Sequence, residues 1–198
     1  MKYSDLTIGI LALQGSVIEH EQAIARIGAK SMRVLKKEQL NEIDGLILPG
    51  GESTTLGKLL HLFGIMEPLR ERIRAGMPVF GTCAGLILLA KEIEGEQPHI
   101  GTMDICVRRN AYGRQIDSFA ALAAIPEFSP KPIELVFIRA PWIADVHAPA
   151  RILAELDGHI IAARQDNMLV TSFHPELTKE SAVHAYFADM CMSGKAPL

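Results

Sequence analysis

Short apolar runs alternate with amphipathic stretches through the first half of the chain. Residues 6–13, 31–35, 45–48 and 77–80 are mainly apolar, and each run ends close to a glycine or a charged residue. Nearly continuous apolar runs of this length are typical of parallel strands that are covered on both faces. Strands that alternate with helices predict an α/β fold, with a doubly wound, mostly parallel sheet flanked by helices.

The stretches between these runs have the marks of helix ends. Gly28 and Gly76 are natural stops for two of the helices. Ser53 or Thr54 is expected to cap a third helix, because a hydroxyl can accept a hydrogen bond from the first free backbone N–H groups. A fourth helix is predicted over residues 84–93, which are rich in leucine and alanine.

The second half of the chain changes character and predicts a small antiparallel ribbon. Asp157-Gly158 is a hairpin turn signal between two short strand candidates. One more strand of the main sheet and a closing helix over 179–192 should follow. The strand candidates are 104–108, 135–138, 151–156, 159–163 and 168–173. We find no internal repeat and no linker, so we expect one domain over residues 1–198.

Composition excludes several classes of function. The 198 residues are 48% apolar and 22% charged, with a formal net charge of -3, which predicts a globular protein without a basic face for nucleic acid or a membrane surface. No apolar run approaches the roughly 20 residues that cross a bilayer. The run 6–13 is interpreted as a strand rather than a secretory core. Three widely separated cysteines favour the cytoplasm.

Cys83 is the first candidate for chemistry. It lies between an apolar run and the predicted helix 84–93, in the pattern Gly81-x-Cys83-x-Gly85. This is the spacing of a nucleophile elbow, in which two glycines allow a sharp strand-to-helix turn. The start of a helix also favours the thiolate form of a cysteine. Cys106 and Cys191 have no such setting and are expected to be structural.

A thiolate nucleophile needs a proton donor and acceptor, and His174 is the best candidate. It follows the predicted strand 168–173, and Glu176 stands two residues further on, where its carboxylate can orient the imidazole. The other six histidines lack a comparable companion and are expected to be surface or helix residues. No metal-ligand spacing is present, so no metal site is predicted. These histidines are His20, His61, His99, His147, His159 and His184.

The segment PGGESTT, residues 49–55, is a third candidate. It can be a simple turn before a helix, or a phosphate loop, although the spacing of a phosphate loop fails because Leu59 follows Gly57-Lys58. Alternatively, a glycine N–H from this segment joins the N–H of Ala84 to stabilise an oxyanion above Cys83. The sequence motif leaves these possibilities open.

The three segments PGGESTT, GTCAGLI and SFHPEL, in this order, resemble class I glutamine amidotransferases of the triad type, which have a flavodoxin-like fold. Further blocks, LALQGSVIEH, RNAYGRQIDSF and FIRAPWI, resemble more narrowly the glutaminase subunits of pyridoxal 5'-phosphate synthase. These blocks cover most of the chain from residue 6 to about residue 177. Residues 120–131 and the last residues of the chain match least.

The resemblance implies that Cys83 attacks the side-chain carboxamide of L-glutamine, that His174 transfers protons and that Glu176 orients His174. It also implies which residues contact glutamine or stabilise the oxyanion. The implied substrate-binding residues are Gly51, Glu52, Ser53, Arg109, Ile138 and Arg139, and the implied oxyanion hole is Gly51 with Ala84.

No cofactor is implied for such a glutaminase. The resemblance implies instead a partner, the synthase subunit that receives the ammonia in a hetero-oligomeric complex for vitamin B6 biosynthesis. Gln14-Gly15 is similar to the segment that responds to docking of that partner. Arg108 departs from the acidic or neutral residue expected beside Arg109, which puts only surface charge or partner contacts in doubt.

Three other interpretations remain. The first is the glutaminase of another biosynthetic pathway, such as histidine or nucleotide biosynthesis. The second is a thioesterase or peptidase of the α/β-hydrolase type, although there the acid precedes the histidine in the chain, whereas Glu176 follows His174. The third is a non-catalytic module in which Cys83 is a redox sensor.

Overall fold

The computed structural model describes residues 2–109 and 118–194. The strands are β1 Thr7–Leu11, β2 Lys30–Val34, β3 Gly45–Leu48, β4 Val79–Thr82, β5 Ala90–Ile93, β6 Met103–Arg108, β7 Ser118–Ala123, β8 Ile133–Ile138, β9 Trp142–Val146, β10 Arg151–Leu156, β11 His159–Gln165 and β12 Met168–Thr171. The helices are α1 Val17–Ile27, α2 Ser53–Leu62, α3 Met66–Arg74, α4 Ala84–Leu89 and α5 Ala182–Gly194, and η1 Lys37–Asn41 and η2 Pro175–Leu177 are 3₁₀ turns.

A parallel sheet forms one half of the molecule, as the alternation of strands and helices predicts. Its strands lie in the order β2-β1-β3-β4-β12, and each neighbouring pair is parallel. This is the 2-1-3-4-5 order of flavodoxin-like sheets, in which ligands bind beyond the carboxyl ends of the strands. The predicted α/β fold class is therefore confirmed.

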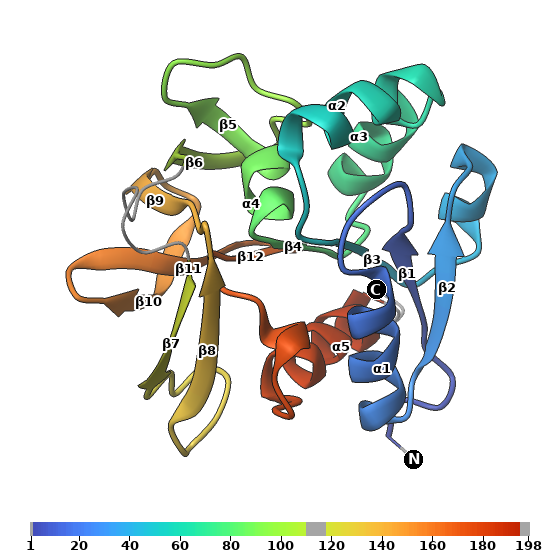
Figure 1. Ribbon diagram of the computed structural model, residues 1–198. Coiled ribbons are helices and arrows are strands. Elements are labelled where there is room, and N and C mark those ends of the chain that lie inside the picture. The colour runs from blue at the N-terminus through green and yellow to red at the C-terminus, as the bar shows by residue number, and fades with distance from the viewer. Residues whose placement is uncertain (1, 110–117, 195–198) are drawn as a thin grey trace.

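Both faces of this sheet are covered, so its central strands are apolar throughout. Every residue of β3 and β4 is buried. Leu46 and Leu48 pack into the hydrophobic cluster that includes α2, α3 and α4, whereas Ile47 packs into the cluster that includes α1 and α5. Figure 1 shows the two layers of helices on opposite sides of the sheet. This arrangement holds the ends of β3, β4 and β12 rigidly side by side.

The second half of the chain extends the sheet with antiparallel strands, as predicted. Strands β10 and β11 form a hairpin whose turn residues, Asp157 and Gly158, both have positive φ. A separate antiparallel pair, β7 with β8, packs its buried side against the cluster of α1 and α5. β12 then returns to pair in parallel with β4, and α5 closes the chain described here.

Several element boundaries differ from the sequence prediction by a few residues, and three differences have a clear physical reason. The helix predicted over 84–93 ends at Leu89, because residues 90–93 form β5 and pair in parallel with β6. Sheet pairing here overrides helix propensity. β4 begins at Val79, two residues after the predicted start, where it comes into register with β3 and β12. The cap of α2 is Glu52 rather than Ser53 or Thr54.

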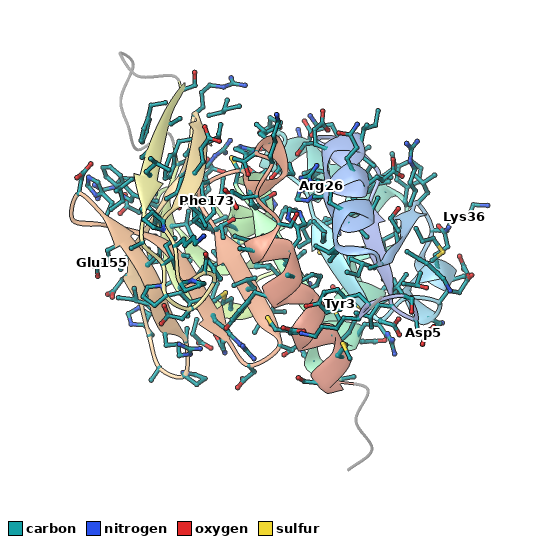
Figure 2. All side chains as sticks on the ribbon, turned by 90° about the horizontal axis from the view of Figure 1, so that it is seen from below. Tyr3, Asp5, Arg26, Lys36, Glu155 and Phe173 are labelled. Atoms are coloured by element: carbon teal, nitrogen blue, oxygen red, sulfur yellow. The ribbon has the colours of Figure 1, made fainter. Side chains whose placement is uncertain are left out.

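Besides β5, two further strands have no counterpart in the prediction. No residue of β7 is buried and only one residue of β9 is, so neither has the continuous apolar signature of the central strands. Within residues 2–109 and 118–194, no helix is long and apolar enough to cross a membrane. Figure 2 views the molecule from the side on which α5 and α1 lie next to each other over the sheet.

Candidate active site

Cys83 occupies the turn between β4 and α4, as predicted for a nucleophile elbow. Its backbone has φ 50° and ψ -100°, a left-handed conformation that a residue with a side chain rarely adopts. The Cys83 N–H donates to the carbonyl of Thr171 at 2.9 Å, which ties the elbow to the end of β12. Backbone strain of this kind, of order 1–3 kcal/mol, persists where the surrounding structure fixes it.

The two glycines that flank Cys83 are required by close packing. A Cβ atom on Gly81 would lie 2.5 Å from the carbonyl carbon and oxygen of Gly85. A Cβ atom on Gly85 would lie 2.1 Å from the carbonyl oxygen of Leu48. These contacts involve backbone atoms, which cannot rotate away, so the elbow and the end of β3 fit together only through glycine.

His174 and Glu176 lie beside the elbow and contact each other. The imidazole Nδ1 of His174 and the Oε1 of Glu176 are 2.7 Å apart. Ser16 donates its hydroxyl to the same oxygen of Glu176 at 2.7 Å. Because Nδ1 is engaged by the carboxylate, Nε2 of His174 is the nitrogen available to the Cys83 thiol. The structure thus brings the three residues singled out by the sequence into one chain of contacts.

The protonation states of this chain follow from its contacts. Burial opposes the charged form of His174, but hydrogen bonding to Cys83 and Glu176 outweighs it and raises the pKa of His174 to about 10. Burial likewise opposes the charged form of Glu176, whose pKa is nevertheless lowered to about 2 by the neighbouring histidines and by Ser16. At pH 7 the pair is an imidazolium beside a carboxylate.

A cavity of about 430 Å³ opens above Cys83. Glu176 and Ala84 are the two predicted site residues that do not line it, and Glu176 lies behind His174. Six residues that the sequence analysis did not assign to the site also line the cavity. Its lining consists of Gln14, Gly15, Ser16, Gly50, Gly51, Glu52, Ser53, Cys83, Ile87, Arg109, Ile138, Arg139, His174 and Leu177.

Glu52 lies at the rim of this cavity and caps α2. Its carboxylate accepts hydrogen bonds from the N–H groups of Thr54 at 3.1 Å and Thr55 at 2.7 Å. The side chain of Thr55 also donates to it at 2.7 Å. These hydrogen bonds, that of the Thr55 side chain first, lower the pKa of Glu52 to about 2. The rim therefore carries a fixed negative charge at neutral pH.

Arg109 faces Glu52 across the rim and is shared between two carboxylates. Its Nη2 lies 3.2 Å from Glu52, and its Nη1 lies 2.6 Å from Glu96. Nη1 also lies 3.3 Å from the hydroxyl of Thr54. The guanidinium is thus oriented at the cavity by partners on two segments.

The end of β8 forms another part of the cavity wall. The carbonyl of Ile138 lies 3.9 Å from the Cys83 Sγ, and Arg139, which follows it, has φ 42°. This left-handed turn brings Arg139 to the cavity. Ser53 also lines the cavity, and its buried hydroxyl has no hydrogen-bond partner among the described residues. It is a polar atom available to a bound molecule.

The peptide between Gly50 and Gly51 has a defined orientation. The Gly50 carbonyl accepts a hydrogen bond from the Ser16 N–H at 3.2 Å, and a Cβ on Gly15 would lie 1.8 Å from that oxygen. In a trans peptide the C=O and N–H groups point in opposite directions. The Gly51 N–H therefore points away from Ser16. Gln14 holds the next residue, because its Oε1 accepts from the N–H of Glu52 at 3.0 Å.

The interpretation of the remaining histidines needs correction. His20 and His184 do lie on helices, as expected, but both are fully enclosed, with exposed fractions of 0% and 1%. The expectation that they lack a companion comparable to Glu176 was wrong, since they pair with each other and His20 also faces Glu176. No local signal marks this pairing, because the two histidines lie 164 residues apart in the chain.

Within the described ranges, no group of three or more His, Cys, Asp or Glu residues is arranged to hold a metal ion. Cys106 lies in β6 and Cys191 in α5, away from the elbow. Most of the RNAYGRQIDSF segment, residues 110–117, lies outside the described residues.

Comparison with known proteins identifies the family. The model of the SNO glutamine amidotransferase family matches residues 10–193. The chain belongs to this family. Curated relatives agree with the assignment along nearly the whole length of this amidotransferase. A pyridoxal 5'-phosphate synthase subunit PdxT from Carboxydothermus hydrogenoformans is 57% identical over 190 residues, covering 96% of this chain and 100% of the relative.

Relatives of the same name occur in other organisms. The PdxT subunit from Streptomyces avermitilis is 54% identical, with 96% of each chain covered, and that from Methanocorpusculum labreanum is 54% identical, with 93% of this chain and 97% of the relative covered. A crystal structure titled glutamine amidotransferase superposes with a TM-score of 0.89 at 43% identity, covering 93% of this amidotransferase and 98% of that chain.

A more distant structure shares the fold alone. A glutamine amidotransferase from Thermotoga maritima has a TM-score of 0.62 at 15% identity, covering 97% of this chain and 86% of that one.

Proposed function

We propose that this amidotransferase hydrolyses L-glutamine to L-glutamate and ammonia, and that the ammonia passes to a pyridoxal 5'-phosphate synthase subunit for vitamin B6 biosynthesis. One observation carries the proposal. A cysteine at a strained elbow faces a cavity beside a histidine whose other nitrogen contacts a buried carboxylate at 2.7 Å. This is the arrangement that thiol-based acyl transfer requires.

In the first half of the reaction, the Cys83 thiolate attacks the carboxamide carbon of glutamine and forms a C–S bond, while the carbonyl electron pair moves to oxygen. The resulting oxyanion is stabilised by the N–H groups of Gly51 and Ala84. His174, protonated at pH 7 because its pKa is raised to about 10, donates its proton to the amide nitrogen. The C–N bond breaks, ammonia leaves and a thioester remains.

In the second half, water attacks the thioester. The neutral His174 formed in the first half accepts a proton from the water, and the C–S bond breaks with its electron pair returning to sulfur. The γ-carboxyl product loses its proton to solvent, and the imidazolium and thiolate are restored. Glu176 stabilises the imidazolium throughout, because its carboxylate is ionised and lies 2.7 Å from the ring.

The cavity offers complementary charges for an α-amino acid. We assign the α-carboxylate of glutamine to the guanidinium groups of Arg109 and Arg139, since planar N–H donors match a carboxylate. Glu52, ionised at neutral pH, and the unpartnered hydroxyl of Ser53 are suited to the α-ammonium group. Ile138 places its backbone carbonyl beside the nucleophile, 3.9 Å from the Cys83 Sγ. The side-chain amide is thereby directed towards Cys83.

The partner and compartment follow from the relatives and the composition. The curated relatives carry the name of a synthase subunit, which supports a complex with the synthase component. Three cysteines spread widely through the sequence support a reducing cytoplasm. We also propose that residues 1–198 act as one glutaminase domain without a cofactor.

The alternatives are less well supported. An α/β-hydrolase is disfavoured because the chain belongs to the amidotransferase family. A redox sensor has no need for a carboxylate-oriented histidine beside Cys83. A glutaminase that serves another pathway remains the main rival, and the identity of the activating partner separates it from our proposal.

The test measures glutamate release from L-glutamine by the purified protein, alone and with a pyridoxal 5'-phosphate synthase subunit. We expect the partner to raise the rate several-fold, and Cys83→Ala to abolish it while partner binding persists. Cys106→Ala is the matched control, because Cys106 lies in β6 away from the elbow.

Each other result has a definite meaning. Hydrolysis that is indifferent to this partner would retain the glutaminase and reject the pathway. Glutaminase activity that persists in Cys83→Ala would reject the nucleophile. A folded wild-type protein that releases no glutamate under either condition would reject the proposed function.

A further inference from the structure

Two buried histidines behind the active site have no part in the mechanism above. His20 comes from α1 and His184 from α5, the two helices that lie side by side in Figure 2. The Nδ1 of His20 lies 3.0 Å from the Nε2 of His184, and the ring centroids are 5.3 Å apart. Phe80 packs edge-on against both rings. Placing two imidazoles in such a site costs solvation, so a structural reason alone would favour apolar residues there.

The histidine pair reaches the catalytic carboxylate. The Nε2 of His20 lies 3.6 Å from the Oε2 of Glu176 and 3.3 Å from the hydroxyl of Thr82. Oε2 makes no hydrogen bond among the described residues, and its contact with Nε2 of His20 at 3.6 Å is longer than a hydrogen bond, whereas Oε1 contacts both His174 and Ser16. The carboxylate of Glu176 therefore lies between two imidazoles, with one facing each oxygen.

The contacts select one tautomer. A ring nitrogen that faces an ionised carboxylate is favoured as an N–H, and the Thr82 hydroxyl at 3.3 Å can accept from it, so we assign the proton of His20 to Nε2 and the lone pair to Nδ1. The Nδ1 lone pair can then accept from an N–H at Nε2 of His184. The remaining nitrogen of His184, Nδ1, is then a buried lone pair without a hydrogen-bond partner in the described part of the chain. The opposite tautomers would turn a lone pair towards Glu176 and bury an unpaired N–H donor.

Both rings are neutral near pH 7. Burial lowers the pKa of His20 despite the opposing attraction of Glu176, and burial lowers the pKa of His184 to about 3. The charged and titratable groups around His20 are Glu176, His174 and Glu19, with His184 against its ring. Those around His184 are His20, Glu176 and Arg26.

We propose that His20 is a positioning residue for the catalytic triad, in which its neutral Nε2–H faces the second oxygen of Glu176 and stabilises it electrostatically, while His184 fixes the tautomer of His20. Through this contact Glu176 stays ionised and aligned, and it sustains the imidazolium of His174. The consequence for the reaction rests on the proposed glutaminase function, whereas the tautomers do not.

The first experiment therefore needs no substrate. Histidine-selective ¹⁵N–¹H NMR of the whole protein at pH 7 distinguishes the two neutral tautomers and the imidazolium. We expect neutral Nε2–H rings at both His20 and His184. An Nδ1–H tautomer or a charged ring at His20 would overturn the proposal, whatever reaction the protein catalyses.

The second experiment compares His20→Leu with His20→Gln, whose amide nitrogen keeps a donor near the position of Nε2. With the synthase subunit present, we expect His20→Leu to lower kcat about 10- to 100-fold, the cost of a buried charged acceptor without its donor, and to leave KM within about twofold. The alkaline limb of the pH–activity profile, which reports loss of the His174 proton, should move down by about one pH unit.

His20→Gln should recover most of kcat and the wild-type alkaline limb, and the exposed His147→Leu should change neither. If His20→Leu folds but has the wild-type kcat and pH profile, the proposal fails. It also fails if Gln and Leu at position 20 are equally impaired, because a packing role alone would produce that result.

A third variant covers the case in which His20→Leu does not fold. His184→Phe does not alter Glu176 but removes the partner that fixes the tautomer of His20. We therefore expect a mixture of His20 tautomers in the NMR spectrum, together with a small downward shift of the alkaline limb of the pH–activity profile. A single Nε2–H tautomer with an unshifted profile would overturn the role of His184.

Discussion

The two sides of the cavity are built in different ways. We call one the catalytic side and the other the recognition side. The catalytic side consists of Cys83, His174 and Glu176, and the recognition side consists of Glu52, Arg109, Ile138 and Arg139. The catalytic residues have exposed fractions of 8%, 7% and 3%. By contrast, the side chains of Arg109 and Glu52 are 25% and 47% exposed.

The difference follows from what each side has to do. Proton transfer needs reacting groups whose positions are fixed to within a few tenths of an ångström in a medium of low dielectric constant. The catalytic residues are accordingly positioned by the central strands and by close glycine contacts. Recognition of a charged amino acid needs groups that exchange one set of partners for another. Arg109 is already shared between Glu52 and Glu96, both of which remain open to solvent. Changes on the catalytic side should therefore affect kcat, and changes on the recognition side should affect KM.

The largest effect is expected from the proton carrier itself. His174→Asn should lower kcat about 10³-fold or more, because His174 is the one histidine among the described residues that lines the cavity and can protonate the leaving ammonia. KM for glutamine should change by less than about threefold. Steady-state glutamate release measures both constants, with the exposed His61→Asn as control. A loss below about tenfold would mean that another base operates.

The second effect concerns the scaffold of the catalytic side. Gly85→Ala places a Cβ 2.1 Å from the backbone oxygen of Leu48, so the elbow has to move away from β3. We expect kcat to fall about 10²-fold, as for small displacements of a reacting group. Gly194→Ala is the matched control, because its Cβ would meet atoms of Pro78 no closer than 3.7 Å. Equal activity of the two variants would show that the elbow tolerates displacement.

The third effect concerns the buried histidines behind the catalytic side and the dependence of stability on pH. His184 is buried with a pKa lowered to about 3, whereas in the unfolded chain it titrates near 6.5. A lowered pKa makes the unfolded state the better proton binder, so stability is lost as pH falls through 6.5. Between pH 7 and pH 5 the loss from this one residue is about 2 kcal/mol, a factor of about 30 in the folding equilibrium. His20, also lowered by burial, acts in the same direction.

The two titrating groups of the catalytic side, His174 and Glu176, respond differently over this interval. His174, with its pKa raised from 6.5 to about 10, contributes fully below pH 6.5 and loses stability progressively between pH 6.5 and pH 10, so it regains about 1 kcal/mol between pH 7 and pH 5 and partly offsets the loss from His184. Glu176, with its pKa lowered to about 2, contributes fully above pH 4.5. Urea unfolding at pH 7 and pH 5 tests the prediction. His184→Phe should show a smaller loss than wild type, and an equal loss in both proteins would contradict it.

The smallest effect is expected on the recognition side. Arg109→Ala should raise KM for glutamine about tenfold, the value of one charge-assisted hydrogen bond, while kcat stays within about twofold. Arg108→Ala is a closely matched control, since the neighbouring arginine pairs with Glu94 on the outer surface. A fall in kcat without a rise in KM would contradict the assignment of Arg109 to substrate recognition alone.

Local sequence patterns predict much of the fold. The run 45–48 matches β3 at both ends, and Asp157-Gly158 is the turn between β10 and β11. The elbow around Cys83 and the segment His174-Pro175-Glu176 could be recognised in the sequence because each is encoded within a few residues. The parallel order then brings them together, since β4 and β12 are neighbours and both segments follow their carboxyl ends.

Other features depend on contacts that no local window contains. β5 follows a helix-forming stretch and becomes a strand only because β6 is beside it. β7 and β9 are half-exposed and lack a continuous apolar run. Glu52, rather than a hydroxyl, caps α2 because its carboxylate reaches two N–H groups at once. The site roles themselves stay predictions until the variants above are measured.

The chain of contacts through Glu176 has a consequence for folding kinetics. Ser16 and Glu176 are separated by 160 residues, and His20 and His184 by 164. Contacts of such high sequence separation require closure of a very long loop, and they contribute to slow folding in proteins rich in non-local pairs. The catalytic carboxylate therefore gains its neighbours only when segments from near both ends of the described chain have docked. During refolding, recovery of glutaminase activity should accompany the last kinetic phase rather than the early formation of helices.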